Sequence, residues 1–471
     1  MGSKNVSLLE VPSTVTTTET TAQTPELNAF GVSNSAILHN VPGTAKKYIY
    51  LGIGALALSG IYSIFLVLLR APILSNIFSN KDLFKTALVI HVNLSVLVWL
   101  LSSIVALWCI SASRKYDYWI CYSSYVASIG IILMAIAPLT GASAPVLNNY
   151  IPMLENWCFI TGLVTFGAAI LIPLFCSLVS AQNTILYYAN CATSIIVLIS
   201  YACFVLSYYS LQKLLFPMDL HFFYETLFWS GGHILQFAYT EGAMVMWLVL
   251  LEQSSGRRLS YSKTYIFILL LNAILSIPGL FPHAAYAIDS MEFTEFFTLH
   301  MKYCAGLAPT MLVIICFLDL VGSAPSSPWI LTSNITTNPL LKRCLISSLF
   351  LFFSGGFIGL LIAGVNVTIP AHYHGSIVGV SIAFMGLSYY ILSPSHLNSR
   401  QPYIYAIGQM MHITGLAVSG GYGVLRKNPD AILTPSAKIT MAIMGFGGLI
   451  AVLGGLMFVW ICVMSFRRLE K

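Results

Sequence analysis

Residues 83–110, LFKTALVIHVNLSVLVWLLSSIVALWCI, form an apolar run whose only charged or histidine side chains are Lys85 and His91. A helix needs about twenty mainly apolar residues to cross a hydrocarbon core about 30 Å thick. This run is long enough, and similar runs recur along the chain. The sequence predicts twelve spanning helices, at residues 48–69, 83–110, 119–139, 157–179, 185–209, 222–251, 265–286, 296–320, 344–363, 370–392, 403–424 and 439–463. The expected fold is an all-α, polytopic membrane bundle of about twelve helices.

The composition agrees with a chain that lies mostly in lipid. Hydrophobic residues make up 57% of it and charged residues only 8%, whereas soluble domains carry about 25% charged residues. A water-soluble fold is thereby excluded. Residues 1–44 differ, being rich in Thr, Ser and Glu, and we expect a disordered tail there ahead of a membrane domain at 45–471. The ten cysteines form no CxxC or CxxCH pattern, which argues against disulfides and a covalently attached cofactor.

The basic residues indicate how the bundle is oriented. Lysines and arginines are more frequent in the loops on the side of the two termini, for example Arg114, Lys115 and Arg343, than on the opposite side. Because cytoplasmic loops collect Lys and Arg, we expect both termini to be cytoplasmic. The net charge of +6 is explained by this asymmetry, so it gives no reason to expect a nucleic-acid partner.

Five histidines are predicted to lie at one depth of the membrane. His91, His233 and the pair His372 and His374 fall early in spans 2, 6 and 10, which run from outside to inside, and His283 ends span 7, which runs the other way. Ionisable side chains within spans are costly and are functional candidates by default. Any one of them could be a helix-packing hydrogen-bonding group. Because neutral imidazole is a common ligand of metals and of heme iron, five together predict a metal layer.

The pair in Ala-His-Tyr-His-Gly at 371–375 adds a geometric constraint. Residues two apart on a helix point about 200° from each other, so His372 and His374 cannot easily bind one ion. They can serve two cofactors on opposite faces of span 10. His91 is available across the bundle to complete one of these two sites.

With this pattern, residues 45–465 resemble the catalytic subunit of the heme-copper oxidase superfamily, which includes the nitric oxide reductases. The most specific features are His-Tyr-His-Gly at 372–375 and the interval of fifty residues from His233 to His283. The resemblance implies two hemes. His91 and His374 would be the axial ligands of a low-spin heme, and His372 the proximal ligand of a high-spin heme.

The resemblance also implies a second metal, copper or non-heme iron, which His233 and His283 would hold opposite the high-spin heme. Arg426 and Lys427, just outside span 11, match the position of family arginines that pair with heme propionates. A plain basic loop is the alternative for these two residues.

The chain departs from the family at two places. Two adjacent histidines normally end span 7, but Ala284 follows His283 here; His300, early in span 8, is a candidate replacement, with a packing role as its alternative. The position four residues after the span 6 histidine, usually tyrosine or glutamate, is Phe237.

Oxygen-bearing side chains nearby are candidates for the missing group. Tyr239 and Glu241 follow His233 on the same predicted helix. We expect them to act as a substitute oxygen ligand or as proton donors. Glu241 is favoured because it sits about two turns inward of His233.

The resemblance implies electron transfer through the low-spin heme to a high-spin heme and second metal, where oxygen is reduced to water. Residues 91–101 look more like the nitric oxide reductase branch, so reduction of nitric oxide to nitrous oxide is the alternative. Two further hypotheses are a degenerate heme-binding homologue without turnover and a twelve-helix secondary transporter. An electron-donating subunit or cytochrome c is the expected partner, and the expected location is a prokaryotic inner membrane.

Overall fold

The computed structural model describes residues 41–70, 81–141, 144–256, 259–322, 338–394, 399–425 and 434–469. The predicted tail lies almost entirely outside the described residues, as do Arg426 and Lys427. These parts of the expectation stay predictions.

The described chain contains twelve long helical segments, which confirms the predicted all-α membrane bundle. The first six are α2 (Gly43–Arg70), α4 (Lys81–Val92) continued by η1 (Asn93–Val98) and α5 (Trp99–Ser111), α6 (Asp117–Ile136), α7 (Trp157–Leu178), α8 (Ile185–Leu211) and α9 (Leu220–Ser255). The second six are α10 (Ser262–Ser276) continued by η4 (Ile277–Leu280) and α11 (Pro282–Ala285), α12 (Met291–Cys304) with α13 (Leu307–Gly322), α14 (Pro339–Leu360), α15 (Thr368–Leu392), α16 (Gln401–Gly421) and α17 (Pro435–Leu469). Short 3₁₀ turns, η2 (Arg114–Tyr116) and η3 (Ala137–Leu139), flank α6.

Eleven of these segments are apolar and long enough to cross a membrane. Among the described segments of that length, α16 is the one whose mean hydropathy is too low for it to be counted with them. It packs nonetheless against α15 and α17. The eighth segment starts at Met291 rather than at the predicted residue 296. Its first turns contain Glu292 and Glu295. Because these residues are charged, the apolar run in the sequence begins later than the helix.

Side-chain caps explain several helix ends. The Asn156 side chain accepts hydrogen bonds from two backbone amides at the start of α7, and the Asp219 side chain accepts one from the Phe222 amide at the start of α9. Polar side chains of this kind satisfy the free amides of a first turn. α9 ends at Gly256, which has a φ of 67°, the left-handed conformation that glycine adopts without strain.

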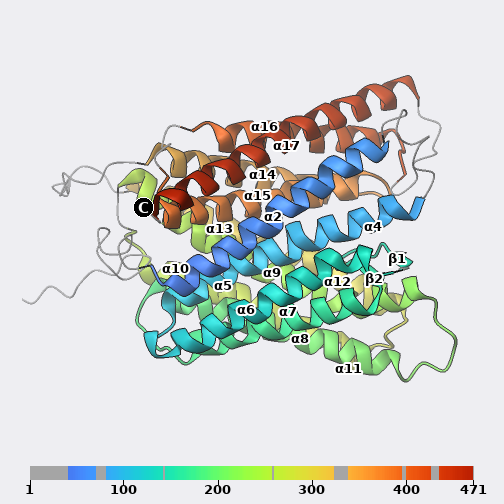
Figure 1. Ribbon diagram of the computed structural model, residues 1–471, viewed down its shortest axis with the longest axis horizontal. Helices are drawn as coiled ribbons and strands as arrows, with labels where there is room; N and C mark the ends of the chain where they lie inside the picture. Colours follow the sequence, from blue (N-terminus) through green and yellow to red (C-terminus); the bar gives the residue numbers. More distant parts are fainter. Residues whose placement is uncertain are drawn as a thin grey trace, which may run out of the picture.

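The helices run along the long axis of the molecule (Figure 1). α2 begins, and α17 ends, at the same end of the bundle, on the left in this view. A short antiparallel hairpin of β1 (Ala144–Val146) and β2 (Met153–Glu155) lies at the opposite end. α4, α9 and α15 all begin at that opposite end. We call it the histidine end, because His91, His233, His372 and His374 lie in the half of these helical segments that is nearer to it.

α9 and α15 form the centre of the bundle. In the most apolar stretch of 18 residues of each helix, 89% of the residues are buried inside the molecule, compared with 22% in the segment of α12 and α13. Large apolar side chains on the outer helices, such as Phe267, Phe317 and Trp460, are exposed and face the region that lipid would fill. Polar side chains on α9 and α15 therefore lie in the protein interior, where burial requires a partner or a function.

Candidate functional site

His91 and His374 lie at matching depths of two neighbouring helices. The indole Nε1 of Trp99 on α5 donates a hydrogen bond of 2.8 Å to the Ser381 hydroxyl on α15. Trp99 follows His91 by eight residues, and Ser381 follows His374 by seven. At 1.5 Å per residue, both histidines lie about 10–12 Å from this contact, towards the histidine end.

The His91 ring, on α4, is hydrogen-bonded to Ser59 of α2. Its Nδ1 lies 3.0 Å from the Ser59 carbonyl oxygen and 2.9 Å from the Ser59 hydroxyl. Because a carbonyl oxygen only accepts, Nδ1 is the protonated nitrogen, and the lone pair is on Nε2. The π-helical turn η1 follows directly, and its Asn93 amide donates to the carbonyls of Val89 and Pro152. Such turns are frequent at functional sites.

The His374 ring is also fixed through Nδ1, which donates to the Pro370 carbonyl at 2.8 Å. Its ring centre lies 5.1 Å from that of His412 on α16. His412 in turn donates from Nδ1 to the Met444 carbonyl of α17 at 3.0 Å. The sequence reading did not select His412, although an isolated histidine within span 11 was a signal that could have found it.

His372 contacts a different neighbour. Its Nδ1 donates to the Gly355 carbonyl of α14 at 2.8 Å. Gly359, one turn further along α14, leaves space for the ring, because a Cβ there would lie 2.5 Å from Nδ1 of His372. Gly355 and Gly375 let the two backbones approach closely, as small residues do between membrane helices. His372 thus packs against α14, and His374 against α16.

These three imidazoles fit the requirements of heme ligands. Histidines that bind a metal commonly donate the second ring nitrogen to a carbonyl or similar acceptor, which fixes the tautomer and the ring orientation. His91, His372 and His374 each have Nδ1 fixed in this way, so Nε2 is the nitrogen that each would offer to iron.

His233 has a different environment. It is buried, with 4% exposure, on α9. Nδ1 donates to the Trp229 carbonyl at 2.7 Å, and Nε2 lies 2.7 Å from the Tyr150 hydroxyl. Since Nδ1 carries the proton, Nε2 accepts from Tyr150. Tyr150 could not be selected from the sequence, because it lies between β1 and β2, outside every predicted span.

The other two candidate metal ligands, His283 and His300, lie among phenylalanine rings. Both ring nitrogens of His283, on α11, are buried without a hydrogen-bond partner. His300, on α12, donates from Nε2 to the Leu275 carbonyl at 2.7 Å, and its Nδ1 is unpaired. The Phe297 ring contacts both His233 and His283, at centroid distances of 5.6 Å and 6.4 Å.

The donor set does not fit a metal held by three histidines. Within the described part of the chain, no three His, Cys, Asp or Glu side chains come close enough together to hold one ion. The lone pair of His233 is engaged by Tyr150, and Phe237 and Phe296 stack on the His300 ring. Ala284, which stands where the family has a histidine, is exposed.

Glu241 is fully buried on α9. Its Oε2 accepts from the Asn272 amide of α10 at 2.9 Å, while Oε1 and the Asn272 Oδ1 have no partner. Unpaired oxygens on two side chains that contact each other in a membrane interior mark a place for a proton or a water molecule. Tyr239 is also buried on α9. Asn272 was not selected from the sequence, because an amide in an apolar span has many structural uses.

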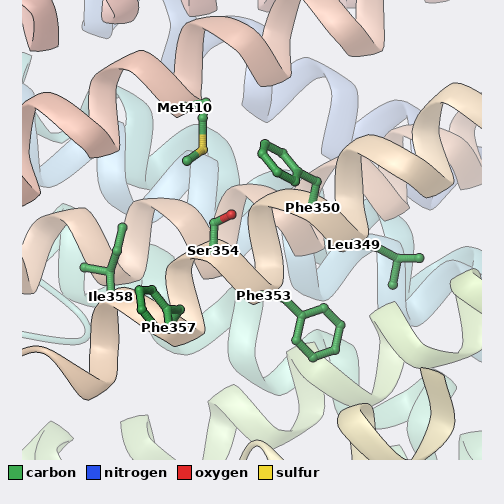
Figure 2. Close-up of a pocket in the computed structure, with 7 residues that line it drawn as sticks. All are labelled: Leu349, Phe350, Phe353, Ser354, Phe357, Ile358 and Met410. Carbon is green, nitrogen blue, oxygen red and sulfur yellow. The ribbon is translucent and has the colours of Figure 1, made fainter. Parts of the chain in front are cut away.

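An apolar pocket on α14 is lined by residues such as Phe350, Phe353 and Phe357 together with Met410 of α16, and none of the candidate site residues lines it (Figure 2). Its one hydroxyl is that of Ser354, and it is lined by no titratable group. Such a surface suits lipid chains better than redox chemistry.

The chain is similar to known proteins over most of its length. A model of the family described as "Cytochrome C and Quinol oxidase polypeptide I" matches residues 43–457. An uncharacterized protein of Rickettsia prowazekii (strain Madrid E) is 40% identical over 485 residues, covering 89% of this chain and 95% of that protein. An uncharacterized protein of Aquifex aeolicus (strain VF5) is 23% identical over 346 residues, covering 72% and 82%.

Among solved structures, a heme-copper terminal oxidase dimer determined by cryo-EM has a TM-score of 0.64 and 19% identity. The match covers 92% of this chain and 84% of that chain. At this identity the likeness concerns the fold, a polytopic bundle of helices.

Proposed function

The chain belongs to the cytochrome c and quinol oxidase polypeptide I family, and on that premise we propose that it is the catalytic subunit of a membrane-bound terminal oxidase that reduces oxygen to water. Membership of an oxidoreductase family leaves the secondary-transporter interpretation without support. The degenerate homologue without turnover stays open as an alternative, since Ala284 and Phe237 depart from the family pattern.

One observation carries the proposal. His372 and His374 pack against α14 and α16, and each has Nδ1 bonded to a carbonyl, while His91 is fixed in the same way at the depth of His374. This arrangement supports a low-spin heme between His91 and His374 and a high-spin heme on His372. Bound hemes would supply electron transfer and gas reduction. Arg426 and Lys427 remain the proposed partners of the propionates.

The chain's own residues would hold, orient and shield these groups. The Ser59 and Gly355 carbonyls fix the rings of His91 and His372. Glu241, with an unpaired oxygen beside Asn272, is the proposed proton relay, because intramembrane carboxyl groups are typical members of such relays. Tyr239 is the second candidate on the same helix. An electron-donating subunit or cytochrome c is the proposed partner, and a prokaryotic inner membrane with cytoplasmic termini the proposed location.

Nitric oxide is a second candidate substrate, favoured by one observation. Phe237 occupies the position at which oxidases of the family carry a tyrosine, and its ring stacks on His300 at 5.2 Å. No phenol is therefore available at that position.

The test is a heme spectrum of the purified full chain, followed by turnover with each gas. We expect a six-coordinate low-spin signal that His91→Ala or His374→Ala removes, and a high-spin signal that His372→Ala removes. His221→Ala, at the exposed start of α9, is the matched control and should leave both signals intact. A wild-type chain that binds no heme would overturn the proposal.

Consumption of oxygen or of nitric oxide by the reduced protein then identifies the substrate. A chain that binds both hemes and consumes neither gas would support the degenerate homologue.

A further inference from the structure

Tyr150 belongs to a loop that several hydrogen bonds fix over the start of α9. The Glu225 carboxylate of α9 accepts from both the backbone amide and the side-chain amide of Asn149. Pro152, at the other side of the loop, accepts from Asn93 at 2.7 Å. The Tyr150 hydroxyl is therefore held between two anchored residues.

The same loop is anchored at its base. The Tyr224 hydroxyl of α9 donates to the Glu155 carboxylate of β2 at 2.5 Å. Within the loop, Asn148 donates from its side-chain amide to the Ile151 carbonyl and accepts from the Tyr150 amide. These bonds define the loop conformation independently of the contact that Tyr150 makes with His233.

The Tyr150 ring fits a space that the sequence of α9 leaves for it. Gly232 lies directly beneath the ring, and a Cβ at that position would overlap it. The Trp229 ring meets the Tyr150 ring edge-on at 5.8 Å, and the His233 ring lies 4.6 Å away. The Tyr150 ring therefore packs against the same turn of α9, residues 229–233, that carries His233.

The hydrogen bond occupies the lone pair that the His233 ring has in this tautomer. Nδ1 of His233 is committed to the Trp229 carbonyl, so Nε2 holds the ring's lone pair, and the Tyr150 hydroxyl donates to it at 2.7 Å. The two other candidate ligands do not complete a metal site with this nitrogen. His283 and His300 have three unpaired ring nitrogens between them, but no three His, Cys, Asp or Glu side chains in the described part of the chain come close enough to hold one ion. The Phe297 ring also contacts the rings of both His233 and His283.

We propose that a Tyr150–His233 hydrogen-bonded pair takes the place of the second metal in this chain, which then binds its hemes but neither copper nor non-heme iron at His233. The inference rests on the proposed function, because only the family pattern assigns a metal to this histidine. Tyr150 is a positioning residue: the Trp229 carbonyl sets the tautomer of His233, and Tyr150 orients the ring and occupies its lone pair.

The first measurement is a metal count on the full chain after incubation with copper and with ferrous iron and removal of unbound ions. We expect total iron to equal heme iron and copper to be far below one per chain. One copper, or one iron in excess of heme, that is bound by the wild type and lost in His233→Gln would overturn the inference while leaving the proposed function intact. Absence of heme would instead count against the proposed function.

The second measurement detects the pair itself, whether or not heme is bound. Thermal unfolding of Tyr150→Phe, His233→Gln and the double variant forms a double-mutant cycle. Both single variants should lower the unfolding temperature, and the double variant should lower it by no more than the larger single effect. Additive effects would mean that the two side chains do not act together, and would overturn the inference.

Tyr224→Phe is the matched control for this cycle. It removes a hydrogen bond from the same anchored hairpin, to Glu155 rather than to His233. Its effect should add to that of His233→Gln. If Tyr224→Phe were coupled to His233→Gln as strongly as Tyr150→Phe, the coupling would reflect the hairpin as a whole and the proposed pair would be refuted.

Discussion

The Trp99 indole donates to the Ser381 hydroxyl at 2.8 Å, and this bond joins α5 to α15 about two turns from His91 and His374. Both side chains are buried. The depth of one proposed heme ligand is thereby fixed relative to the other by a contact that neither ligand makes. Disruption of this bond should disturb the proposed low-spin site without removing a ligand.

Trp99→Phe tests that relationship. The substitution leaves the Ser381 hydroxyl buried without its donor, which costs about 1–3 kcal/mol, and the low-spin heme signal should broaden or weaken. Trp108→Phe is the control, since Trp108 is also fully buried on α5 but its Nε1 has no hydrogen-bond partner. Chemical denaturation and the absorption spectrum are the measurements. Equal effects of the two variants would show that lost ring volume, and not the bond, matters.

Gly359→Ala should displace His372. A Cβ at position 359 would lie 2.5 Å from Nδ1 of the imidazole, so the ring must move from its place beside Gly355. We expect loss of the high-spin heme signal and retention of the low-spin signal. Gly356→Ala, on the same helix, meets nothing within 4 Å and gains the same helix propensity. A high-spin signal that survives in Gly359→Ala would contradict the assignment of His372.

The membrane bundle could be predicted from the sequence because each span is a local apolar run. The interruptions were harder to see. Span 7 contains the 3₁₀ turn η4 and the short helix α11, with prolines at 278 and 282, yet its apolar run is continuous. α16 carries Gln409 and His412, and its mean hydropathy is lower than that of the other long segments. Its packing against α15 and α17 nonetheless places it in the bundle.

The site could be predicted only in part, for a physical reason. Histidines in spans stand out because burial of an imidazole is costly, which led to His91, His233, His372 and His374. The groups that engage them are ordinary side chains whose importance depends on tertiary packing. Tyr150 and Asn272 lie 83 and 31 residues from the side chains they contact, His233 and Glu241, and no local pattern links them.

His412→Phe should change the low-spin heme selectively. The His412 ring lies 5.1 Å from that of His374, and its replacement makes the surroundings of the proposed ligand less polar. Because lower polarity disfavours the more highly charged oxidised iron, the reduction potential of the low-spin heme should rise while that of the high-spin heme stays constant. Ile407→Phe, at an exposed position of α16, is the control. A redox titration in which both hemes shift equally would refute a local effect.

Glu241→Gln should slow turnover without loss of heme. The variant keeps the shape of the side chain and a bond to Asn272, but it has no carboxyl proton to transfer. Removal of a positioned proton-transfer group typically costs about 10²-fold or more in rate, so gas consumption should fall by that order while the heme spectrum stays unchanged. Glu252→Gln is the matched control, because Glu252 is also buried on α9 but accepts from the Leu259 amide near the other end of that helix.

Should both variants turn over at the wild-type rate, protons must reach the site by a route that avoids Glu241. Should both be slowed equally, the loss would reflect a buried carboxylate on α9 in general, and the unpaired Oε1 beside Asn272 would have no special part in proton delivery.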